Sequence, residues 1–109
     1  MARRCTVAEW RGIVDRVTLT AGFPRDYHVE IVRVPNLEHH GFAADVDLET
    51  GHFKIEIDVD MTAAHTADIL MHEVAHVLDW RPLTPFTRDH GPTFWIHFGE
   101  VWCRYHQTT

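Results

Sequence analysis

The hydrophobic positions of this chain repeat with a helical period near the N-terminus. Apolar side chains recur at helical spacing between residues 6 and about 20: Trp10, Ile13, Val14 and Val17. Thr6 can cap the start of this segment, and Glu9 three residues later completes a capping box. Gly22 and Pro24 then interrupt the pattern. The first predicted element is therefore a helix.

Apolar and polar residues alternate in the middle of the chain, which is the period of a strand. The first predicted strand runs from Tyr27 to Val34 and is broken by Pro35. Two more strands flank a short turn at residues 49–51. Their apolar positions are Phe42, Ala44, Val46 and Leu48 in one strand, and Phe53, Ile55, Ile57 and Val59 in the other. This pattern predicts a hairpin with one buried face and one solvated face. The solvated face would carry Asp45, Asp47, Glu56, Asp58 and Asp60.

Helical spacing returns in the second half of the chain. A helix from about 62 to 80 is predicted by Leu70, Val74, Val77 and Leu78. Thr62 or Thr66 can cap this helix, and Pro82 stops it. A last helix from about Pro92 to Gln107 has its apolar stripe at Phe94, Phe98, Val101, Trp102 and Tyr105. The order helix, three strands, helix, helix predicts an α+β domain with an antiparallel or mixed sheet backed by helices.

Length and composition are those of one small domain. A chain of 109 residues can bury a modest core, and no repeat or linker divides residues 1–109. No apolar run approaches the roughly 18–20 residues of a membrane span, and the N-terminus lacks the apolar stretch of a signal peptide. Cys5 and Cys103 are predicted to be reduced thiols. These features predict a cytoplasmic protein outside the membrane.

The predicted helix at 62–80 contains the segment with the clearest chemistry, His72-Glu73-Val74-Ala75-His76. Residues four apart on a helix lie one turn apart on the same face, so the rings of His72 and His76 can reach one metal ion. Glu73 lies beside them, where a carboxylate can take a proton from a metal-bound water. The motif therefore predicts a catalytic metal site on this helix.

A catalytic zinc ion takes three protein ligands and leaves a fourth position open to water, so a third ligand must follow. Asp79 and Pro82 stand where a metzincin has glycine and histidine, which excludes that class. Glu100 on the last predicted helix is one candidate. His90 is the better one, because the loop at residues 81–89 is long enough to turn the chain back toward the pair.

The two motifs together, His-Glu-x-x-His at residue 72 and His-Gly-Pro-x-Phe at residue 90, resemble the SprT-like zinc metalloproteases over about residues 60–107. This resemblance implies a small zincin-like domain with the order helix, sheet, active-site helix and C-terminal helix. It implies one catalytic Zn²⁺ ion with His72, His76 and His90 as ligands, and Glu73 as the catalytic base. The chain has too few cysteines for the zinc ribbon of many relatives, so it would be a minimal catalytic core.

The function implied is that of a zinc metalloendopeptidase, which hydrolyses peptide bonds of a protein or peptide substrate with a metal-activated water. Asp79 and Asp89 are candidates to orient the zinc-bound histidines, because such a ring usually donates its other N–H to an oxygen. His97 and Tyr105 are candidates to border the cleft and to stabilise an oxyanion.

Two other functions fit the same residues. One is a non-catalytic, zinc-stabilised binding module, although a purely structural site needs no carboxylate at Glu73. The other is a repressor-cleaving type of metalloprotease, in which Glu100 would replace His90. Many relatives act on proteins attached to DNA and have basic surfaces, whereas the net charge of −6 argues against DNA association here. So small a core can depend on a partner protein for targeting.

Overall fold

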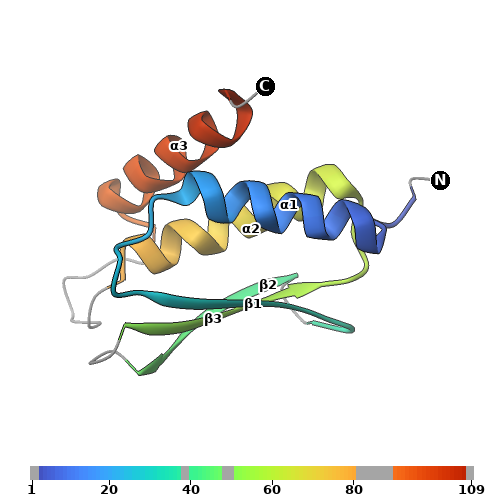
Figure 1. Cartoon of the computed structure of the whole chain (residues 1–109), viewed down its shortest axis with the longest axis horizontal. Helices are drawn as coiled ribbons and strands as arrows, with labels where there is room; N and C mark the ends of the chain where they lie inside the picture. The colour runs from blue at the N-terminus through green and yellow to red at the C-terminus, as the bar shows by residue number, and fades with distance from the viewer. Residues whose placement is uncertain (1–2, 38–39, 48–50, 81–89, 108–109) are drawn as a thin grey trace.

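The computed structural model describes residues 3–37, 40–47, 51–80 and 90–107, and its elements follow the predicted order. The helices are α1 (Val7–Ala21), α2 (Ala63–Leu78) and α3 (Pro92–Gln107). The strands are β1 (His28–Val34), β2 (Gly41–Asp47) and β3 (His52–Asp58). α1 and α2 cover one face of the sheet, and α3 crosses them on the side away from the sheet (Figure 1). The chain therefore has an α+β fold.

The sheet is mixed, with the strand order β1-β3-β2. β3 is parallel to β1 and antiparallel to β2, so the wholly antiparallel form of the prediction is wrong. Phe53, Ile55 and Ile57 of β3 are completely buried. The strand with the most regular apolar alternation thus occupies the centre of the sheet, where a neighbour on each side covers its edges.

Gly41, the first residue of β2, faces α2. Phe42, expected on the buried face, is paired with Glu56, whereas Gly41 is paired with the buried Ile57. At Gly41 an added Cβ atom would lie 2.6 Å from Cγ2 of Ile69 on α2. β2 therefore passes so close to α2 at this point that a side chain there would displace a neighbour. The side chains of Phe42, Ala44 and Val46, which the alternation predicts to be buried, lie outside the described part of the chain. Leu48 and the predicted turn at 49–50 lie outside the described residues.

Side-chain caps fix where the helices begin. The Thr6 hydroxyl accepts from the Glu9 amide, and the Glu9 carboxylate accepts from the Thr6 amide, so the predicted capping box of α1 is confirmed. α1 ends at Gly22, whose φ of 74° is the left-handed conformation that glycine adopts readily. Of the two candidate caps for α2, Thr62 is the one used. The predicted stop at Pro82 lies outside the described residues.

The core lies between the sheet and the two helices that cover it. The helices contribute mostly aliphatic side chains that are fully buried: Val17, Leu70, Met71, Val74, Val77 and Val101. Cys5 is buried and Cys103 is exposed, and both are free thiols as predicted. Within the described ranges, no helix has the length and hydrophobicity that would let it cross a membrane.

The predicted acidic face of the hairpin is only partly solvated. Asp58 is buried, and its carboxylate lies 3.5 Å from Nδ1 of His40. Asp60 is exposed and is paired with Arg4 at 2.8 Å. Asp58 and Asp60 therefore have structural partners within the chain, and the side chains of Asp45 and Asp47 lie outside the described residues.

Candidate metal centre

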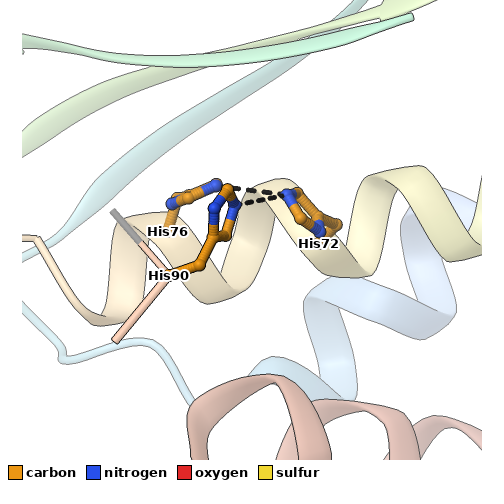
Figure 2. Close-up of side chains that lie close together, drawn as sticks. All are labelled: His72, His76 and His90. Carbon is orange, nitrogen blue, oxygen red and sulfur yellow. Dashed lines mark hydrogen bonds between the residues drawn. The ribbon is translucent and has the colours of Figure 1, made fainter. Parts of the chain in front are cut away.

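Three histidine rings from two parts of the chain meet above the second half of α2 (Figure 2). His72 and His76 lie one turn apart on α2, and His90 lies two residues before α3 begins. Nε2 of His72 is 3.2 Å from Nε2 of His76 and 3.2 Å from Nε2 of His90. One ligand atom from each residue falls within 4.8 Å of the other two, so this cluster can hold a metal ion.

The spacing of the nitrogens fits a tetrahedral site. Zn–N bonds of about 2.0–2.1 Å at tetrahedral angles place neighbouring nitrogens about 3.3–3.4 Å apart. The two observed separations of 3.2 Å are close to that value. A neutral imidazole nitrogen has either one N–H or one lone pair, so Nε2 of His72 can make only one good hydrogen bond. A shared cation satisfies all three nitrogens at once.

The environment of His72 favours the protonation state that a metal requires. Its side chain is half-buried, and burial together with the charge of nearby His90 lowers the pKa of His72 below its usual value. A lower pKa keeps the imidazole neutral at lower pH, with a lone pair for a metal.

A phenylalanine supports all three rings. The ring of Phe94, in the first turn of α3, lies 5.0 Å from that of His72, 4.5 Å from that of His76 and 4.8 Å from that of His90, between centroids. Phe94 is completely buried. Sequence reasoning placed Phe94 in the core stripe and missed this contact, although its position four residues after His90 was a signal that it would lie near that ring.

Glu73 follows His72 directly on α2, and its side chain lies on the flank of the helix that faces β2. Its side chain is almost fully buried. A Cβ atom added to Gly41 would lie 3.1 Å from Cγ and 3.3 Å from Oε2 of Glu73. The carboxylate thus occupies the narrow space between α2 and the edge strand β2. Sequence reasoning did not identify Gly41 as part of this site.

The described contacts of the remaining candidates are as follows. Asp79 caps the C-terminus of α2, where its amide donates to the carbonyl of Ala75. His97 is half-buried on α3 and does not belong to the cluster. Tyr105 packs under the guanidinium of Arg16, 4.9 Å from the ring centre, and burial raises the pKa of Tyr105. Asp89 lies outside the described residues.

Glu100 does not bring a carboxylate oxygen into the group formed by His72 and His76, as an acidic third ligand would. It is exposed on α3, and its carboxylate is paired with Arg104 at 3.2 Å. His90, by contrast, contributes a nitrogen to the cluster. No protein-family model, curated protein or solved structure matches this chain. The geometry of the cluster is therefore the basis for any statement about function.

Proposed function

We propose that this chain is a zinc-dependent metallopeptidase with the minimal SprT-like, zincin-type architecture. The observation that carries the proposal is the convergence of three imidazole nitrogens with a buried carboxylate, Glu73, on the adjoining flank of the same helix. Three imidazoles with tetrahedral spacing suit zinc better than the oxygen-preferring ions calcium and magnesium. One zinc ion would be held by His72, His76 and His90.

The residues of the chain would divide the chemistry among them. Zinc, when bound, supplies a Lewis acid and lowers the pKa of a water molecule toward about 7. Glu73 takes a proton from the attacking water on a carboxylate oxygen and later passes it to the leaving amine nitrogen. Phe94 keeps the three rings in place and excludes solvent from their inner side. The products are a carboxylate and an amine.

The position of β2 supports a mode of substrate binding. β2 is an edge strand, it contacts α2, and Gly41 brings its backbone next to Glu73. An extended peptide that adds to this edge would have its carbonyl groups beside the metal centre. Protein or peptide segments in an extended conformation are therefore the proposed substrates. A partner protein for targeting stays part of the proposal, as does a cytoplasmic location, which the two free thiols favour.

The alternatives have less support. A zinc site used only for stability gains nothing from a buried carboxylate beside it, because burial of an acidic group is costly. The type with an acidic third ligand would need Glu100, whose carboxylate is paired with Arg104 instead. A role on DNA is opposed by the net charge of −6.

The test compares hydrolysis of denatured casein by the zinc-loaded wild type and by Glu73→Gln. The substitution preserves the size of the side chain and removes its basicity. We expect turnover to fall by about 10²–10⁴-fold while one zinc ion per chain remains bound. Equal turnover by the two proteins would remove Glu73 from the mechanism. Hydrolysis by neither protein would refute the proposed activity.

A further inference from the structure

An aromatic strip leads away from the metal centre along α3. It consists of Trp95, Phe98 and Trp102, whose spacing of three and four residues puts them on one flank of the helix. The ring of Trp95 lies 6.0 Å from that of His90 and 5.9 Å from that of Phe98, between centroids. The two tryptophans are 54% and 44% exposed. The aromatic strip therefore starts next to His90, a candidate metal ligand, and its two tryptophans are exposed to solvent.

The far end of the aromatic strip borders a hollow that is lined by α1, α2 and α3. The hollow has a volume of about 460 Å³, and Trp102 forms part of its wall. Its α2 side is made of small residues and one acid: Ala63, Ala64, Ala67 and Asp68. Asp68 precedes His72 by one helical turn, so the hollow begins about one turn from the metal centre.

Charge on α3 is kept away from the aromatic strip. Glu100 and Arg104 form an ion pair on the opposite flank of the helix. Among the described residues, five large apolar side chains are exposed, and three of them (Trp95, Ile96 and Trp102) belong to α3. Exposed apolar surface of this kind, next to a candidate reaction centre, marks a binding surface for apolar groups.

We infer that the aromatic strip binds large apolar side chains of the substrate on one side of the hydrolysed bond. This inference rests on the proposed peptidase function. A substrate carbonyl held at the proposed metal centre would lie near His90, whose ring is 6.0 Å from that of Trp95. Because an extended peptide advances about 3.3 Å per residue, side chains two residues apart are about 6.6 Å apart, and successive ones reach Phe98 and the hollow at Trp102. The substrate class is thus extended segments rich in Phe, Leu and Trp, such as core segments exposed by unfolding.

The test measures kcat/KM for matched peptides that carry Phe or Ala next to the cleaved bond. We expect the wild type to prefer the Phe peptide by about tenfold or more, the usual size of such apolar discrimination. Trp95→Ala should bring that ratio close to one, because kcat/KM should fall more for the Phe peptide than for the Ala peptide. Ile96→Ala is the matched control, because this side chain is 59% exposed but lies on another flank of α3. It should keep the wild-type ratio.

Equilibrium binding of the Phe and Ala peptides tests the same preference without hydrolysis. Zinc-loaded Glu73→Gln protein should bind the Phe peptide about tenfold more tightly than the Ala peptide in calorimetry, and the double variant with Trp95→Ala should not. An unchanged preference in Trp95→Ala and Trp102→Ala would overturn the inference, while Glu73-dependent hydrolysis would leave the proposed function standing. A fall in molecular mass of Trp102→Ala in sedimentation, with the preference intact, would identify the strip as a contact between two copies and also overturn it.

Discussion

Gly41 determines how closely the edge strand approaches the proposed catalytic base. Gly41 has an ordinary strand conformation, so a glycine is needed there because there is no room for a side chain, and not because of the backbone angles. A Cβ atom there would meet Ile69 at 2.6 Å and the Glu73 side chain at 3.1 Å and 3.3 Å. The first contact is shorter than packed atoms tolerate, so a larger residue must displace β2, Ile69 or Glu73.

We predict that Gly41→Ala impairs hydrolysis without impairing zinc binding. Overpacking of this kind destabilises a domain by about 1–3 kcal/mol. A displacement of the Glu73 carboxylate by about 1 Å should lower kcat by about a hundredfold. Zinc content should stay at one ion per chain, because the atoms nearest to the added Cβ belong to Ile69 and Glu73 and not to the three histidines. The measurements are kcat, metal content and urea denaturation.

The Ile69→Ala variant separates the effect of the contact with Ile69 from that of the contact with Glu73. In Ile69→Ala protein the 2.6 Å contact no longer exists, so Gly41→Ala should cost less stability there than in the wild type. Its effect on kcat should persist, since the contacts with Glu73 remain. Loss of zinc together with activity, or unchanged kcat in both backgrounds, would contradict the role given to Gly41.

Single residues differ in how far sequence alone could assign them to the site. The ligand spacing of His72 and His76 is local, because a helix fixes it whatever else the chain does. His90 required only a loop of sufficient length. Phe94 and Gly41 became visible as site residues only in three dimensions, because their roles depend on how α3 and β2 pack against α2.

At the scale of elements, α1 begins with a charge-dependent cap. The Arg3 guanidinium, which donates to the Glu9 carboxylate at 2.6 Å, and the Thr6 amide, which donates at 2.9 Å, lower the pKa of Glu9 to about 2. Because this pKa is below the usual value of 4.5, the folded state favours the ionised form. The stabilisation is therefore complete above about pH 4.5 and is lost as the pH falls toward 2.

We predict that Glu9→Gln is less stable than the wild type at neutral pH and that the difference shrinks as the pH falls from 4.5 toward 2. The effect should be small, because both partners are in solvent and the pair is screened. Urea denaturation at pH 7, 5, 4 and 3 measures it. The matched control is Glu30→Gln, an exposed acidic residue of β1 outside any helix cap. If the difference in stability between the two proteins did not change with pH, the stabilisation by Glu9 would come from the shape of its side chain and not from its charge.

The elements that sequence predicted well are those with one unambiguous apolar stripe. The three helices and β3 have such stripes, and their bounds agree with the prediction to within a few residues. β2 has no such unambiguous stripe, because both of its alternating sets of residues contain small or apolar side chains. A shift of the strand by one residue would exchange its two faces. Its pairing with β3 is also irregular between Asp45 and Asp47, so alternation along this strand is not continuous. At Gly41, α2 lies too close to the strand for a side chain to fit without displacing a neighbour.

For the whole molecule, a bound metal would tie together parts that are far apart in sequence. His72 and His76 belong to α2, whereas His90 precedes α3, which also packs on α1. An ion shared by these residues would fix the start of α3 against the second half of α2. Because the unfolded chain has no preformed site, the free energy of metal binding is added to the stability of the fold.

We predict that removal of the metal lowers the melting temperature of the whole domain. Zinc at a hundred times its dissociation constant contributes about 2.7 kcal/mol, which corresponds to roughly 10 °C or more for a domain of this size. Calorimetry with zinc and with excess chelator measures the shift. Glu100→Ala and His97→Ala should keep it, and His90→Ala should lose it, since only His90 of these three joins the cluster. A shift that persists in His90→Ala but disappears in Glu100→Ala would establish the acidic third ligand, because the ion would then connect α2 to the middle of α3 and not to its start.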